Sequence, residues 1–188
     1  MVPTAMVTLS AAEAERAIVS FQKFLQFETV SAAAALSGAY AECADYIMKE
    51  LESLNCMSDI HILAECPNDS PVVVCHWKGE DETLPVILLN SHYDVVPVAS
   101  EDWTLPAFEG VRKDGKIYGR GAQDMKCVCI QYIEAIRKII SITPDYKPAR
   151  TVYLTFVPDE EVGGSGMAAF LDSKLFKQDL PGIALALD

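Results

Sequence analysis

The chain has 188 residues, of which 51% are hydrophobic and 22% are charged, and its formal net charge at pH 7 is -12. This length suits one domain with a sizeable core. The acidic balance argues against nucleic acid and against an anionic membrane as partners, because both bind basic surfaces. The apolar runs are strand-sized and the start, Met1-Val2-Pro3-Thr4, lacks the basic and apolar regions of a signal peptide, so we expect a cytoplasmic protein.

Two amphipathic helices are predicted near the start of the chain. Ser10 and Glu13 have the spacing of a capping box, and apolar residues follow at helical spacing as far as Leu25. A second apolar stripe at helical spacing covers about 39–54. Both stripes indicate packing against a core and not a cofactor site.

Apolar runs bounded by polar residues predict five strands, which we place near 58–64, 71–78, 84–91, 151–157 and 183–187. Interleaved with helices, they indicate an α/β fold, a three-layer αβα sandwich. We expect the sheet to be mixed, because short turns join the early strands, and to be mostly parallel.

The segment 98–115 is predicted to be a loop. Its large side chains, Trp103, Pro106 and Phe108, could cover a functional site, although such residues more commonly pack against the sheet. The sequence leaves both outcomes open.

A His-x-Asp pair closes the third predicted strand, at His92 and Asp94. In a strand, side chains two apart share a face, so Asp94 can lie near His92, fix its tautomer and raise its basicity toward a metal. For an isolated pair, a polar strand end followed by a turn former would be the favoured interpretation.

A second polar position, Asp124, follows the glycines at 119 and 121 and a short strand predicted at 116–118. The helix pattern runs from about 125 to 140, so Asp124 stands near a helix N-terminus. It could cap that helix, or its two oxygens could bridge two cations. Capping and bridging compete as explanations.

Three adjacent carboxylates, Asp159, Glu160 and Glu161, directly follow the fourth long strand. Their mutual repulsion must be relieved by a cation or by exposure to water. A solvated acidic loop is the usual answer. The alternative is a division of labour, in which one glutamate binds a metal while its neighbour takes a proton from water.

Asp188 follows the last apolar run and completes a set of four candidate ligands at strand ends or strand-to-helix connections. The set is His92, Asp124, Glu161 and Asp188. Nitrogen and oxygen ligands of these types suit zinc.

Three segments carry a resemblance to a known family: Asn90 to Pro97, Gly119 to Lys126, and Phe156 to Gly164. They resemble the motifs of the di-zinc aminoacylase and acetylornithine deacetylase family, and the resemblance spans nearly the whole chain. It implies a zinc exopeptidase-like fold and two Zn²⁺ ions in the complete active site.

The resemblance also implies a role for each candidate residue. The implied ligands are His92, Asp124 and Asp188 for the first zinc ion, and Asp124 and Glu161 for the second. Glu160 would be the general base and Asp94 would orient His92. A cis peptide bond would fall at Asp124-Met125.

The implied activity is that of an amidohydrolase that releases the acyl group from small N-acyl-L-amino acids, by attack of a zinc-bridging water. Two alternatives stay open. One is a dipeptidase or another deacylase of the same family, and the other is a non-catalytic metal-binding fragment.

Members of this family continue for a few hundred residues beyond the motifs. The resemblance therefore implies that 1–188 is the N-terminal part of a zinc-binding catalytic domain. It implies that a lid or dimerisation domain and a C-terminal return segment, which supplies a histidine to the second zinc, are absent. The expected partners are that C-terminal segment and, at full length, a second copy in a homodimer. Neither His61 nor His76 matches the missing ligand, and we expect the chain alone to hydrolyse poorly.

The six cysteines are predicted to be free thiols, since none shows Cys-x-x-Cys spacing. Cys127 and Cys129 lie near the candidate bridging residue. Residues two apart on a helix face different ways, so the two thiols cannot easily reach one ion.

Overall fold

The computed structural model describes residues 8–31, 33–67 and 69–188. The first four residues, on which the expectation about a signal peptide rests, lie outside this part of the chain. No helix in the described part is long and apolar enough to cross a membrane. The helices are α1 (Ala11–Leu25), α2 (Ala34–Ser37), α3 (Ala39–Glu52), α4 (Lys126–Ile142) and α5 (Ser165–Asp172), with short turns η1 (Ser100–Asp102), η2 (Glu160–Val162) and η3 (Leu175–Asp179).

Five strands form one sheet in the order β1-β2-β6-β3-β7. They are β1 (Ser58–Ile62), β2 (Val73–Trp77), β3 (Val86–His92), β6 (Val152–Val157) and β7 (Ile183–Leu187). The sheet is mixed, as predicted. Its β1-β2 and β2-β6 pairs are antiparallel and its β6-β3 and β3-β7 pairs are parallel. Half of the pairings are therefore parallel rather than most of them, because β2 runs against both of its neighbours.

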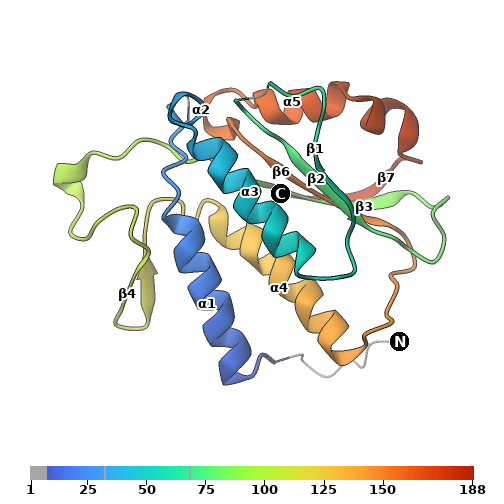
Figure 1. Cartoon of the computed structure of the whole chain (residues 1–188), viewed down its shortest axis with the longest axis horizontal. Helices are drawn as coiled ribbons and strands as arrows, with labels where there is room; N and C mark the ends of the chain where they lie inside the picture. The colour runs from blue at the N-terminus through green and yellow to red at the C-terminus, as the bar shows by residue number, and fades with distance from the viewer. Residues whose placement is uncertain (1–7, 32, 68) are drawn as a thin grey trace.

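Helices cover both faces of this sheet, which confirms the three-layer αβα arrangement (Figure 1). On β2, Val73 and Cys75 pack with α3 and α4 on one face, while Val74 packs with Phe170 of α5 on the other. This alternation follows from the two-residue period of a strand, and it explains why β2 is apolar at nearly every position.

The first helix begins as the capping-box pattern predicted. Ser10 Oγ accepts a hydrogen bond from the Glu13 N–H at 3.3 Å, and the Glu13 carboxylate accepts one from the Ser10 N–H at 2.7 Å. Two of the otherwise unpaired N–H groups at this helix end are thereby satisfied.

The prediction of a plain loop over 98–115 is wrong in part. This segment contains η1 and the strand β4 (Val111–Lys113), which pairs antiparallel with β5 (Lys116–Tyr118). Asp114 and Gly115 connect them, and both have positive φ, at 52° and 73°. An Asp-Gly pair at positive φ is the preferred two-residue hairpin turn. The short strand predicted at 116–118 is confirmed as β5, whereas β4 has three residues and is too short for periodicity to reveal.

The chain connections create the crevice in which a site can form. After β3 the chain passes to α4 on one face of the sheet, and after β6 it passes to α5 on the other face. The connections therefore leave the two parallel strands in opposite directions, which opens a crevice at their carboxyl ends. His92 and Val157 stand opposite each other there, in register.

Candidate metal centre

His92 is the last residue of β3, and its side chain is 4% exposed. Its Nδ1 lies 3.1 Å from the backbone oxygen of Asp94 and 3.3 Å from Asp94 Oδ1. Its Nε2 lies 3.1 Å from Asp124 Oδ1. The ring is therefore held by Asp94 on one side and presents its other nitrogen to a second carboxylate.

Asp94 is fully buried, and its oxygens bind more than the imidazole. Oδ2 accepts hydrogen bonds from the Ser31 hydroxyl at 2.6 Å and from the Glu161 N–H at 3.2 Å, and Oδ1 accepts one from the Glu160 N–H at 3.1 Å. Burial by itself raises the pKa of Asp94, but the hydrogen bonds from His92 and Ser31 outweigh it and hold that pKa below its usual value. A single carboxylate thus joins the end of β3 to the turn that follows β6.

Asp124 does not cap α4. The N-cap position is Met125, which makes no side-chain cap, while the Asp124 carboxylate turns to His92. The capping alternative is therefore wrong for this residue. The peptide bond between Asp124 and Met125 is cis, as the family resemblance implied. Just before it, Gly121 has φ +80°, and a Cβ there would lie 2.6 Å from Val95 Cγ1, so the turn requires glycine.

The three adjacent carboxylates have different surroundings. Asp159 has φ 62°, and its carboxylate accepts hydrogen bonds from Tyr40 at 2.8 Å and Ser165 at 2.9 Å. It anchors the turn η2. Glu160 reaches the site instead, with Oε2 3.8 Å from His92 Nε2. The geometry is thus compatible with one glutamate binding a metal while its neighbour takes a proton from water. Asp159 instead has a structural role, which the sequence did not reveal.

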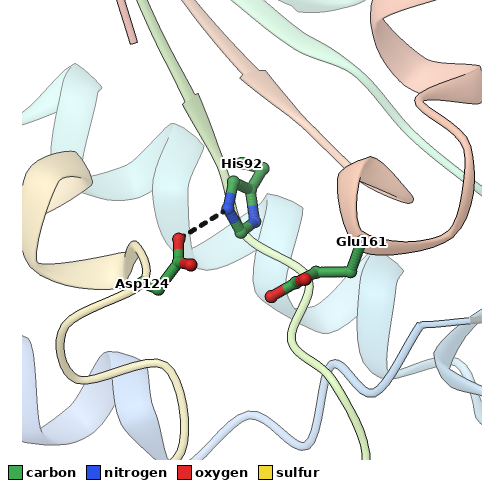
Figure 2. A group of neighbouring side chains, drawn as sticks. All are labelled: His92, Asp124 and Glu161. Atoms are coloured by element: carbon green, nitrogen blue, oxygen red, sulfur yellow. Dashed lines mark hydrogen bonds and ion pairs between the residues drawn. The ribbon is translucent and has the colours of Figure 1, made fainter.

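Three of the four predicted ligands come together (Figure 2). His92, Asp124 and Glu161 each offer one ligand atom, and these atoms lie within 4.8 Å of one another. They reach the site from the end of β3, the loop before α4 and the turn after β6. One imidazole nitrogen and two carboxylate oxygens are a donor set that fits zinc.

The electrostatics of this group also favour a cation. Burial lowers the pKa of His92, but the hydrogen bonds and negative charges of Asp94 and Asp124 outweigh burial and raise it to about 9. Burial raises the pKa of Glu161; His92 opposes that shift, while the carboxylates of Asp124, Asp94 and Glu160 add to it. Crowded carboxylates of this kind are stabilised when a positive ion lies between them.

The fourth predicted ligand, Asp188, lies apart from this group. Its Oδ1 accepts a hydrogen bond from Asn90 Nδ2 at 2.7 Å, and Asn90 in turn accepts one from the Thr155 hydroxyl at 2.7 Å. Asn90 is two residues before His92 on the same strand face, so Asp188 stands at the correct edge of the sheet. Its role as a ligand stays a prediction.

The remaining histidines lie elsewhere. His61 is exposed, with Nδ1 2.6 Å from the Asp59 carbonyl. His76 pairs in register with Tyr153, near the start of β6, whereas the site lies at its end. His76 is 8% exposed, and its ring packs against that tyrosine at a tilt of 33°. Neither belongs to the metal-ligand group.

All six cysteines are free, as predicted. Cys129 is buried, and burial raises the pKa of its thiol to about 12, although a hydrogen bond with Ser91 opposes the shift. Cys127 is partly exposed, and its Sγ donates to the Gln123 carbonyl at 3.2 Å. A zinc-thiolate site at this pair is therefore not formed.

A hollow of about 740 Å³ opens beside the metal-ligand group. Its wall contains Asp124 and Glu161, together with Trp103, Tyr118 and Arg120. Of the bulky loop residues, Trp103 therefore lies beside the site, whereas Pro106 and Phe108 line a neighbouring hollow.

Two supporting residues could not be predicted from the sequence, because neither stands in a motif. Ser31 donates a hydrogen bond to Asp94, and Tyr40 donates one to Asp159.

Comparison with known proteins gives a family match over residues 88–187, to "Peptidase family M20/M25/M40". Among curated proteins, aminoacylase-1 of Sus scrofa is 53% identical over 116 residues, which is 61% of this chain and 28% of that protein. Aminoacylase-1 of Homo sapiens is 50% identical over the same shares, and that of Dictyostelium discoideum is 43% identical over 62% of this chain and 29% of the relative. The chain thus spans less than a third of the length of these relatives.

Solved structures share the fold. The di-peptidase Dug1p from Saccharomyces cerevisiae has a TM-score of 0.77 at 21% identity, covering 93% of this chain and 38% of that one. Human carnosine dipeptidase 1 has a TM-score of 0.78 at 18% identity over the same shares. These matches confirm the expected three-layer αβα architecture.

Proposed function

Since the chain belongs to peptidase family M20/M25/M40, we propose that it forms part of a zinc-dependent amidohydrolase that releases the acyl group from N-acyl-L-amino acids. The observation that carries this proposal is the meeting of His92, Asp124 and Glu161 within 4.8 Å, with Glu160 beside them. The identity of 53% with an aminoacylase-1 supports the substrate class.

The proposed cofactor is a pair of zinc ions. His92 and Asp188 would hold the first, Glu161 would hold the second, and Asp124 would bridge them. Support comes from the donor atoms gathered at the end of β3 and from the place of Asp188 on the neighbouring strand. When bound there, zinc would act as a Lewis acid on the scissile carbonyl and would lower the pKa of water.

The proton transfers fall to Glu160. Its carboxylate faces the metal-ligand group, and its side chain is 49% exposed, so water and substrate can reach it. Glu160 would take a proton from the attacking water and pass it to the leaving amine nitrogen. Asp94 would keep His92 in one orientation and, through two backbone N–H groups, hold Glu160 and Glu161 at the distance this transfer needs.

The complete enzyme would contain more than this chain. We place 1–188 as the N-terminal part of the catalytic domain, with a lid or dimerisation domain and a C-terminal return segment supplying a further histidine. The share of 28% of aminoacylase-1 that the chain spans supports this division. A homodimer in the cytoplasm is the proposed assembly and location.

Two adjacent glutamates provide the test, since Glu160→Gln and Glu161→Gln remove the same charge from neighbouring positions. In the assembled enzyme, with N-acetyl-L-methionine as substrate, Glu160→Gln should lower kcat by about 10²–10⁴ while the zinc content stays unchanged. Glu161→Gln should lower the zinc content. Glu101→Gln, at an exposed position of η1, is the control. Wild-type turnover by Glu160→Gln would reject it as the base.

The dipeptidase alternative is separated by substrate. N-acetyl-L-methionine and an unblocked dipeptide differ on the carbonyl side of the scissile bond, where the first has an acyl group and the second an amino-acid residue, so comparing their turnover in the same enzyme separates the two activities. Faster turnover of the dipeptide would favour the dipeptidase, and turnover of neither would favour a non-catalytic metal-binding fragment.

A further inference from the structure

Lys126, the first residue of α4, has a buried side chain to which the proposed function gives no role. It is 0% exposed, although lysine is almost never fully buried in folded proteins unless its ammonium is paired. Its Nζ donates to the backbone carbonyls of Phe24 at 3.2 Å and Phe27 at 2.8 Å, and it lies 5.1 Å from the centroid of the Phe24 ring. The side chain therefore fastens the start of α4 to the end of α1.

The simplest explanation of these contacts is that Lys126 caps α1, since positive groups are favourable at a helix C-terminus. The two carbonyls do not need the lysine as their partner, however. The Phe24 carbonyl also accepts from the Phe27 N–H at 3.4 Å, and the Phe27 carbonyl accepts from the Thr29 N–H at 2.9 Å. A second role, toward the residues on the other side of Lys126, is therefore worth considering.

On that other side, Lys126 contacts the turn that carries Asp124. Its backbone N–H donates to the Gly121 carbonyl at 3.1 Å. A Cβ on Gly121 would lie 3.4 Å from Lys126 Cδ, so the turn packs directly on the lysine side chain. The position of the turn therefore depends on where this side chain is held.

Asp124 relies on its backbone more than His92 does. The His92 side chain is 4% exposed and is held by Asp94, whereas the Asp124 side chain is 78% exposed. Among the described residues, only His92 forms a hydrogen bond with the Asp124 carboxylate. A side chain with one partner and little packing is placed mainly by the backbone that carries it.

The other end of the contact leads back toward His92. Thr29, two residues after Phe27, donates through Oγ1 to the Tyr93 carbonyl at 2.6 Å, and its own carbonyl accepts from the Val95 N–H at 2.9 Å. The segment that binds the ammonium is thus itself bonded to the chain directly after β3. The ammonium thereby connects the turn before α4 with the end of β3.

We propose that Lys126 is a positioning residue, which holds the Asp124 carboxylate beside His92 so that both can bind one metal ion. The inference rests on the proposed function for the metal ion. Capping of α1 makes a different prediction. If Lys126 only stabilises the fold, its replacement lowers the free energy of unfolding and leaves the folded site unchanged. If Lys126 positions Asp124, the folded site itself changes.

The test variant is Lys126→Met, which keeps an unbranched apolar chain and removes the three N–H donors of the ammonium. It should fold, because both carbonyls keep an N–H partner. Ile136→Ala is the control, since Ile136 is 4% exposed on the same helix, outside the turn, and its truncation also destabilises the fold. Thr29→Val removes the 2.6 Å hydrogen bond at the other end of the connection and gives the same test if Lys126→Met does not fold.

The first readout needs no metal. In the metal-free chain at one fixed pH, the ¹⁵N chemical shift of His92 Nε2 reports its contact with Asp124. Asp124→Ala gives the shift of a ring without that contact. Lys126→Met should move the His92 signal toward this value, and Thr29→Val should move it less far in the same direction. Ile136→Ala should leave the signal at its wild-type position.

The second readout is zinc affinity, measured on the folded variants by competition with a chelator. Lys126→Met should weaken zinc binding about 10- to 100-fold, as replacement of a residue that supports a metal ligand typically does, and Ile136→Ala should leave it unchanged. A wild-type His92 signal in Lys126→Met, or zinc binding as tight as in wild type, would overturn the inference. A wild-type chain that binds no zinc would contradict the proposed function instead, and the His92 signal would still decide the role of Lys126.

Discussion

Strands β3 and β7 follow the same sequence pattern, an apolar run with a candidate ligand at its end, but they differ in what surrounds them. β3 lies between β6 and β7, and most of its residues are buried. Among the strands of the described residues, β7 pairs with β3 alone, and every one of its residues is exposed. His92, on β3, is buried and bound by Asp94, whereas Asp188, after β7, is exposed and bonded to Asn90.

The difference shows what makes a ligand position rigid. The strand pattern decides which edge of the sheet a side chain reaches, and both residues reach the same edge. Packing on both sides of the strand, together with a buried hydrogen-bond partner, decides whether the side chain is then fixed. The rigidity of the metal-ligand group therefore depends mainly on β3 and its contacts.

The largest effect is expected from Asp94→Ala. The change leaves the Ser31 hydroxyl and the N–H groups of Glu160 and Glu161 without their acceptor, and it removes the partner of His92. We expect a loss of about 3–5 kcal/mol in the free energy of unfolding. Zinc affinity should fall by about 10- to 100-fold.

Denaturant unfolding and zinc titration check this prediction. Asp45→Ala, at an exposed position on α3, is the control and should leave both quantities unchanged. Zinc affinity equal to wild type in a folded Asp94→Ala protein would show that His92 needs no orienting carboxylate.

The next effect compares the two strands directly, through one leucine on each. Leu88 on β3 is 5% exposed and Leu187 on β7 is 46% exposed. Leu88→Ala should cost about 2–5 kcal/mol of unfolding free energy, because it leaves a cavity between β3 and α5. Leu187→Ala should cost less than about 1 kcal/mol. Equal losses in the two variants would mean that β7 is as well covered as β3.

A smaller effect is expected at Ser31, which touches no candidate ligand. Ser31→Ala removes its 2.6 Å hydrogen bond to Asp94 and should cost about 1–2 kcal/mol of unfolding free energy. Ser37→Ala is the control, because it removes only local hydrogen bonds, one donated to the Ala34 carbonyl and one accepted from the Ala39 N–H. Equal losses of unfolding free energy in the two variants would show that the buried hydrogen bond to Asp94 stabilises the fold no more than a local one does.

Much of the fold could be predicted because β2, β3 and β6 are largely buried and their sequences are therefore largely apolar. Of the hairpin β4-β5, only β5 was predicted. The strand β4 has three residues, too few for periodicity to reveal, and only the Asp114-Gly115 turn marks the hairpin in the sequence. The equal split between parallel and antiparallel pairs also depends on strand order, which no local pattern encodes.

The candidate ligands could be named from motifs, but their supports could not. Asp94 meets Ser31 and the backbone of Glu160 across more than 60 residues of sequence. Backbone N–H groups are the same at every position, so a contact made through them has no signature in the sequence. The anchoring role of Asp159 was hidden for a similar reason, since its left-handed backbone and its bond to Tyr40 exist only in the folded chain.

The most direct test of the central claim is the zinc content of the purified chain and of three single variants, measured by atomic emission. We expect His92→Ala and Asp124→Ala each to lower the zinc bound per chain, with the greater loss for Asp124→Ala because Asp124 would serve both ions. His61→Ala, at an exposed histidine outside the metal-ligand group, should keep the wild-type content. Unchanged zinc in both His92→Ala and Asp124→Ala would contradict a metal centre at the end of β3.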